Sequence, residues 1–196
     1  MIRYKQLLEE VRGCTLCEPS LEHGVRPVLQ FHPQAKILVA GQAPGRKVHK
    51  TGVPFDDASG KRLREWMGID EAVFYDPKQV AILPMGFCYP GTGKSGDLPP
   101  RTECAAAWRD SLMAKFEGLE LTLLIGQYAL AWHMPSATGN LTETVRDWKQ
   151  HLPDNLPVPH PSPRNNIWLK RNAWFEHDVV PALQKRVKTA LGKRPV

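Results

Sequence analysis

Four cysteines are the residues whose types and spacing most directly suggest chemistry. Cys14 and Cys17 form a Cys-x-x-Cys pair, and fifteen residues separate Cys88 from Cys104, around a loop rich in glycine and proline. In an intracellular protein, such a pair is more often a metal or redox site than a structural disulfide. Four cysteines with none left over suit either tetrahedral zinc or a [4Fe-4S] cluster, and spacing alone does not separate the two.

A turn bounded by glycine and proline follows the first apolar run of the chain. Residues 36–40 are mostly apolar and partly β-branched, which predicts a short buried strand. Gly41-Gln42-Ala43-Pro44-Gly45 ends that strand abruptly, and a glycine lets a ligand or another backbone come close. Because ligands in an open α/β sheet bind beyond the carboxyl ends of strands, we expect a site at this turn.

Two further segments have unusual compositions. Directly after the turn, Arg46-Lys47-Val48-His49-Lys50 concentrates basic side chains, and Gly52-Val53-Pro54-Phe55 must be a bend. The other segment is His160-Pro161-Ser162-Pro163-Arg164-Asn165, a loop made rigid by its prolines. Both 41–55 and 160–165 are expected to follow strands, although the residues before 160 give no strand bounds, so we expect the two segments to meet at one end of the sheet.

The elements that must position these segments alternate between strands and helices. Strands are predicted at 36–40, 79–85 and 121–125. Helices are predicted at about 3–13, at 127–133, and over the apolar positions from Phe175 to Leu191. Three further helices are predicted to begin at caps, namely Ser59, Thr102 and an Asn140–Glu143 capping box. In the last helix, Pro181 marks a kink or the first turn. This alternation predicts an α/β fold, a three-layer α/β/α domain around a mostly parallel sheet of about four strands.

Composition limits the class of protein. With 196 residues, 42% hydrophobic and 23% charged, we expect one globular domain over 1–196, with a frayed tail at 192–196. No apolar run is long enough for a membrane span and no signal peptide is visible, which favours the cytoplasm. We also expect a monomer. A formal net charge of +6 favours polyanionic partners such as nucleic acid.

Together these segments resemble the uracil-DNA glycosylase superfamily over nearly the whole chain. The turn 41–45 is similar to the first glycosylase motif, and 52–55 resembles the Gly-x-Pro-Phe of the iron–sulfur (family 4) branch. The loop 160–165 is similar to the second glycosylase motif, and its sequence is closest to that of the single-strand-selective branch. The cysteines match the family 4 arrangement, so the resemblance implies a [4Fe-4S] cluster rather than zinc, tying the N-terminal helix to the loop 90–100.

The resemblance also implies an activity and roles for individual residues. It implies base-excision repair of DNA containing a damaged base: uracil or a related deaminated base is flipped out and hydrolysed off, which leaves an abasic site. His160 would donate a hydrogen bond to the leaving base, and Phe55 would stack on it. Backbone groups of Gly41, Ala43, Pro44 and Gly45 would contact base and sugar, while Ser162, Arg164 and Asn165 would contact DNA, with Arg164 as a phosphate contact or minor-groove wedge.

This chain departs from the family pattern at the positions that matter for water and for base recognition. Gln42 and Ala43 stand where active branches carry acids, which leaves Gln42 to orient water and makes His49 and Asp57 the nearest titratable candidates for activating it. Pro84 replaces the asparagine that reads uracil in family 4. The base preference is therefore expected to be relaxed or different (hypoxanthine, xanthine or a modified pyrimidine), or backbone groups near Met85 and Gly86 read the base.

Two other functions stay open at this point. The first is a non-catalytic or redox-sensing binder of damaged DNA that keeps the iron–sulfur cluster and has lost the water-activating group. The second is a cross-linking relative in which a histidine traps the abasic sugar. The stretch from Arg46 to His49 is only faintly similar to the basic insertion of that branch and has no extra length.

Overall fold

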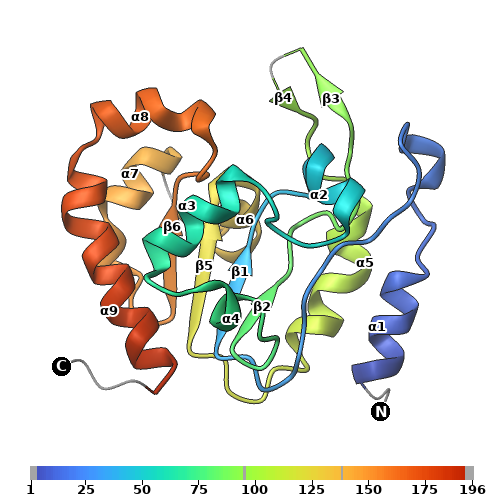
Figure 1. Ribbon diagram of the computed structural model, residues 1–196, viewed down its shortest axis with the longest axis horizontal. Coiled ribbons are helices and arrows are strands. Elements are labelled where there is room, and N and C mark those ends of the chain that lie inside the picture. The colour runs from blue at the N-terminus through green and yellow to red at the C-terminus, as the bar shows by residue number, and fades with distance from the viewer. Residues whose placement is uncertain (1–3, 95, 138, 193–196) are drawn as a thin grey trace.

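The computed structural model describes residues 4–94, 96–137 and 139–192. A four-stranded sheet with the order β2-β1-β5-β6 lies at the centre (Figure 1), and its strands are β1 Ile37–Ala40, β2 Val80–Ile82, β5 Leu121–Ile125 and β6 Asn155–Val158. Every pairing in this sheet is parallel. The predicted three-layer α/β/α fold with a parallel sheet of about four strands is therefore confirmed.

Helices cover both faces of this sheet. They are α1 Tyr4–Arg12, α2 Arg46–Thr51, α3 Ala58–Met67, α4 Glu71–Phe74, α5 Thr102–Met113, α6 Gly126–His133, α7 Leu141–Arg146, α8 Asn166–Arg171 and α9 Val180–Ala190. A π-helical turn, Phe175–Val179, precedes α9, and short 3-10 turns occupy Glu18–Ser20, Trp148–Gln150 and Pro163–Asn165. A small antiparallel hairpin, β3 Thr92–Gly93 with β4 Gly96–Asp97, projects beside α2 (Figure 1).

The alternation of side chains along β1 divides the core into two clusters. Ile37 and Val39 pack with residues of α3 and α9 on one face of the sheet. Leu38 and Ala40 pack with residues of α1, α5 and α6 on the other face. Because both faces are covered, β1, β2 and β5 are buried at every position, which explains their continuous apolar runs.

The fourth strand of the sheet, β6, precedes the loop 160–165, where a strand is expected but its bounds are not predicted. Its sequence, Asn-Leu-Pro-Val, contains Pro157, which has no N–H to donate to a sheet. The strand lies at the edge of the sheet, where a proline is tolerated because one side has no partner strand. Its pairing with β5 places Pro157 opposite Leu124 and brings the following loop to the carboxyl end of the sheet.

Two predicted helix caps are wrong. Asp57, not Ser59, caps α3, because its side chain accepts a hydrogen bond from the Gly60 N–H (2.9 Å). Thr102 is the first residue of α5 rather than its cap, and the capping position, Arg101, makes no side-chain capping bond.

Other local predictions are confirmed, and one region is new. The capping box of Asn140 and Glu143 is present at the start of α7, and Pro181 lies in the first turn of α9. The basic run after the glycine turn forms the helix α2, for which no element was predicted. Residue 3 of the predicted first helix and residues 193–196 of the predicted tail lie outside the described residues, and the single-domain organisation stays a prediction. Across the described part of the chain, no helix is both long and apolar enough to cross a membrane.

Candidate functional site

A cavity of about 600 Å³ opens at the carboxyl ends of β1, β2 and β6. The turn 41–45, the bend after α2 and the loop 160–165 all line it, so the predicted meeting of these segments is confirmed. Of the residues proposed from the sequence, the structure brings together Gly41, Gln42, Ala43, Pro44, Gly45, Phe55, Asp57, His160, Ser162, Arg164 and Asn165.

His160 has a defined protonation state in this cavity. Its Nδ1 accepts a hydrogen bond from the Ser162 N–H (3.2 Å), so the neutral ring carries its proton on Nε2. Burial lowers the pKa of His160, the negative charges of Asp57 and Asp97 partly oppose this, and Arg164 adds to the lowering. The ring is therefore a neutral imidazole whose Nε2–H can donate to a ligand.

The loop that carries His160 is held by side chains on both sides. Asn165 donates from Nδ2 to the His160 carbonyl (2.7 Å), and Arg62 on α3 donates from Nη1 to the carbonyls of Pro161 (3.4 Å) and Ser162 (3.3 Å). The Ser162 hydroxyl oxygen accepts from the Arg164 N–H (3.2 Å) and caps the 3-10 turn. Its own hydrogen stays available for a phosphate oxygen.

The glycine turn is fixed against the segment that follows β2. The carbonyls of Gly41 and Gln42 accept from the N–H groups of Met85 (2.9 Å) and Gly86 (3.0 Å). Neither N–H group is thus available to read a base, and a backbone reading at these residues would have to use carbonyl oxygens. Pro84 itself lines the cavity.

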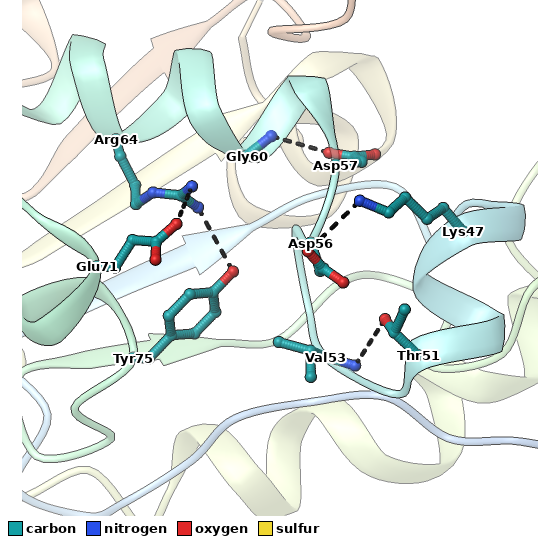
Figure 2. A network of polar contacts seen from close by, with 9 residues as sticks. All are labelled: Lys47, Thr51, Val53, Asp56, Asp57, Gly60, Arg64, Glu71 and Tyr75. Atoms are coloured by element: carbon teal, nitrogen blue, oxygen red, sulfur yellow. Dashed lines mark hydrogen bonds and ion pairs between the residues drawn. The ribbon is translucent and has the colours of Figure 1, made fainter.

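Phe55 is held in a backbone conformation that is unusual for its residue type. Its φ is 56°, in the left-handed region, which costs about 1–3 kcal/mol outside glycine. The ring lies against Gly41 and meets Phe74 edge-on, with 6.2 Å between ring centroids. Figure 2 shows how polar contacts fix the surrounding bend: Lys47 pairs with Asp56 (3.5 Å), and Asp57 caps α3.

Gly60 makes the bend possible and provides a test of it. A Cβ at this position would lie 1.7 Å from the Phe55 carbonyl oxygen, so the backbone of the bend would have to move. We expect Gly60→Ala to lower the free energy of unfolding by about 2–3 kcal/mol in urea titrations and to displace Phe55. Gly13→Ala is the matched control, since its Cβ would meet only ordinary contacts. Equal stability of the two variants would contradict this account of the bend.

Among the residues predicted to activate water or to contact DNA with their side chains, His49 does not line the cavity. Its ring packs against the rings of Tyr89 (5.8 Å between centroids) and His23 (6.5 Å). Burial lowers the pKa of His49. Its neighbours Arg46 and Lys47 on α2 do line the cavity and give its rim positive charge.

Several side chains at the site were not found from the sequence. Asp97, on β4 of the hairpin, lines the cavity together with Asp57. Arg62 holds the loop 160–165, and Arg109 on α5 donates to the carbonyls of Leu83 (2.6 Å) and Pro84 (3.2 Å). These contacts join residues that are far apart in the sequence, so no local sequence pattern predicts them.

Arg109 is a fully buried cation whose partner is His133 on α6. The Arg109 Nη2 lies 2.6 Å from the His133 Nε2, which must accept, because a guanidinium only donates. Burial lowers the pKa of Arg109 to about 10, so it stays charged at neutral pH. Burial and the Arg109 charge lower the pKa of His133 to about 4.

The shifted pKa of His133 makes stability depend on pH. Between about pH 4 and 6.5 the unfolded chain binds more protons at this histidine than the folded chain, so stability falls as the pH falls through that window. We expect the drop in unfolding free energy between pH 7.5 and 5 to be smaller in His133→Asn than in the unmodified protein, by about 1–2 kcal/mol. Urea titrations at both pH values measure it, and identical pH dependence would contradict it.

The four predicted metal ligands also come together. A second cavity is lined by all four, and each is a free thiol: Cys14, Cys17, Cys88 and Cys104. The Trp108 Nε1–H donates to the Cys14 Sγ (3.3 Å), and the Phe87 N–H donates to the Cys104 Sγ (3.3 Å). Burial, with smaller contributions from the neighbouring cysteines, raises the pKa of Cys104 to about 12.

Four free cysteines that line one cavity fit a metal centre that binds four thiolates. Such N–H donors would stabilise the sulfur charge that a bound metal centre creates. Among the described residues, no three histidine, cysteine or acidic side chains converge closely enough to hold one metal ion. Tetrahedral zinc would need the sulfurs to move to about 2.3 Å from a single point.

Comparison with known proteins gives two findings. The family model of the uracil DNA glycosylase superfamily matches residues 29–184. A protein of Sulfurisphaera tokodaii named type-4 uracil-DNA glycosylase is 29% identical over 101 residues, which cover 52% of this chain and 45% of that protein. The match thus spans less than half of this relative, and the family match begins after Cys14 and Cys17.

Proposed function

Because the chain belongs to the uracil DNA glycosylase superfamily, we propose that it hydrolyses the N-glycosidic bond of uracil or a related deaminated base in DNA and leaves an abasic site. The observation that carries the proposal is His160, a neutral imidazole with its proton on Nε2, in the cavity that Phe55 and the turn 41–45 enclose. The type-4 name of the relative from Sulfurisphaera tokodaii supports the same reaction.

The proposed mechanism depends on charge that develops on the leaving base. The target nucleotide is flipped into the cavity, where its base stacks on Phe55. As the bond between sugar C1′ and base nitrogen breaks, its electron pair passes to the base. The His160 Nε2–H donates to the base oxygen where this negative charge accumulates, and it needs no prior protonation to do so. Water then adds to C1′, and the proton that it loses neutralises the base anion through solvent.

The residues around the cavity suit a DNA backbone. Arg46 and Lys47 on α2 and Arg164 on the opposite loop place positive charges at its rim. We propose that these side chains, with the Ser162 hydroxyl, contact phosphates on either side of the flipped nucleotide. Such contacts are independent of sequence and weaken as salt increases.

The four cysteines are proposed to hold a [4Fe-4S] cluster. What supports this is the shared cavity, the free thiols and the N–H donors from Trp108 and Phe87. When bound, the cluster would supply covalent ties between the end of α1 and the loop between β2 and α5, a structural role. Arg101, which pairs with Glu103 at this cavity, would then be fixed at the surface.

The base preference is proposed to extend beyond uracil. Pro84 lines the cavity and offers no side-chain hydrogen bond to a uracil edge. The nearby N–H groups of Met85 and Gly86 are already bonded. Hypoxanthine, xanthine and modified pyrimidines are therefore candidate substrates in addition to uracil.

One observation favours a second function. The turn 41–45 has no acid, because Gln42 and Ala43 occupy the positions where active branches carry one. A binder of damaged DNA that keeps the cluster but does not turn over would share this feature. It would bind lesions preferentially without releasing a base.

A panel of oligonucleotides separates the two functions. Each carries one uracil, hypoxanthine, xanthine or modified pyrimidine, in single- and double-stranded form, and alkaline treatment cleaves any abasic site. The proposal expects cleavage of at least one substrate by metal-loaded protein. Preferential binding with no cleavage of any substrate would favour the non-catalytic binder, and a covalent DNA adduct would revive the cross-linking relative.

A further inference from the structure

The cavity lacks an acid at the turn but not elsewhere. Among the described residues, two carboxylates line it, those of Asp57 and Asp97. An attacking water needs a group that orients it and accepts its proton, and a carboxylate is suited to both tasks. The two acids differ in whether their carboxylates already accept a structural hydrogen bond.

Asp57 already has a structural task. Its Oδ1 accepts from the Gly60 N–H (2.9 Å) as the cap of α3, next to the strained bend at Phe55. Removing this carboxylate would uncap the helix and loosen the bend. Its orientation is set by the helix terminus rather than by the cavity.

Asp97 reaches the cavity on a hairpin that is tethered at several points. At the base, the Leu98 N–H donates to the Gly91 carbonyl (2.9 Å), and Gln42 Nε2 donates to the Leu98 carbonyl (3.0 Å). Near β4, the guanidinium of Arg164 lies against Gly96, since a Cβ there would be 2.9 Å from Nη1. These contacts join the hairpin to the turn 41–45 through Gln42 and to the loop 160–165 through Arg164. Figure 1 shows where the hairpin lies.

The carboxylate of Asp97 faces the glycine turn. A Cβ on Gly45 would lie 3.5 Å from the Asp97 Oδ2, so this oxygen occupies the space beside the turn. The charge of Asp97 also reaches His160, since it favours the protonated ring against the lowering of the pKa by burial. Asp97 thus lines the same cavity as His160 and lies beside the turn 41–45.

We propose that Asp97 is the catalytic residue that orients the attacking water and accepts its proton, in place of the acid that the turn 41–45 lacks. This inference rests on the proposed glycosylase function. In the step, the glycosidic bond breaks and its electron pair leaves with the base. The water oxygen then bonds to C1′, and one water proton passes to an Asp97 oxygen and from there through solvent to the base anion. The products are the neutral base and the abasic sugar.

The test measures single-turnover base release and DNA binding separately, on the substrate that the unmodified protein cleaves. We expect Asp97→Asn to release base about 10²-fold more slowly and to bind the same DNA as tightly or more tightly, because a negative charge near phosphates is lost. Asp110→Asn is the control: it makes the same charge change on the exposed surface of α5, away from the cavity. It should release base at the unmodified rate.

Chemical rescue distinguishes two causes of a lower rate in an Asp97 variant, which are loss of the proton acceptor and displacement of the hairpin. Asp97→Ala should regain part of its rate when formate is added, because a small carboxylate can occupy the vacated space, and chloride at equal ionic strength should not restore it. Asp97→Asn with an unchanged rate, or Asp97→Ala without formate rescue, would overturn the assignment. If the unmodified protein itself releases no base, it is the proposed function that fails.

Discussion

Replacing His160 with alanine is expected to lower the single-turnover rate of base release by about 10²–10³-fold. The reason is that the neutral ring donates from Nε2 to a base oxygen whose charge grows only as the glycosidic bond breaks. The bond therefore strengthens in the transition state and adds little to ground-state binding. Binding of the same substrate should stay within about threefold of the unmodified protein, since the phosphate contacts are separate.

The comparison needs a histidine that is remote from the cavity. His177→Ala serves, because His177 is exposed on the π-helical turn before α9 and pairs only with its neighbour Asp178 (2.6 Å) among the contacts described. Rapid-quench measurements on the cleaved substrate give the rate, and fluorescence anisotropy gives the affinity. A His160→Ala protein that loses affinity but keeps its rate would contradict the role assigned to Nε2.

Replacing Cys104 with serine is expected to remove the metal centre and unfold the segment around it. Cys104 is the most buried of the four cysteines, and its Sγ accepts from the Phe87 N–H. The unmodified protein should be brown and contain about four irons per chain, whereas Cys104→Ser should be nearly colourless. Its unfolding free energy should fall by several kcal/mol, because metal binding to the folded state contributes directly to stability.

Trp108→Phe is the matched variant for this experiment. It removes the Nε1–H donor to Cys14 but keeps all four thiols, so it should retain iron and lose much less stability. Metal analysis and urea titration of both variants provide the readout. Colourless unmodified protein with one zinc per chain would overturn the cluster and leave the glycosylase proposal standing. Equal stability of Cys104→Ser and the unmodified protein would contradict any structural metal centre.

The fold could be predicted wherever burial alone shapes the sequence. The strands at 37–40, 80–82 and 121–125 are covered on both faces, so their apolar runs are unbroken. The bounds of strand β6 could not be predicted, because Pro157 is tolerated in an edge strand but is not typical of a strand sequence. Asp57 and Ser59 are both good caps, and only the backbone geometry decides between them.

The candidate site also has a part that the sequence predicts and a part that it does not. The turn 41–45 and the loop 160–165 are contiguous motifs, so the sequence shows them directly. Asp97 enters through a hairpin whose position depends on contacts with Gln42 and Arg164, which only the folded chain brings together. His49 is near the turn in sequence, but helix α2 directs its ring toward His23 and Tyr89 instead.

The central claim is that the cavity between the turn 41–45 and the loop 160–165 releases a base from DNA by breaking its glycosidic bond. The most direct measurement is chromatographic detection of free base from DNA labelled in the damaged base, with the abasic strand quantified in parallel. The account predicts equal amounts of free base and abasic site for at least one deaminated base, and almost none from His160→Ala in the same time. Lesion-containing DNA that is bound by the metal-loaded protein and recovered intact, with no free base from any substrate, would contradict it.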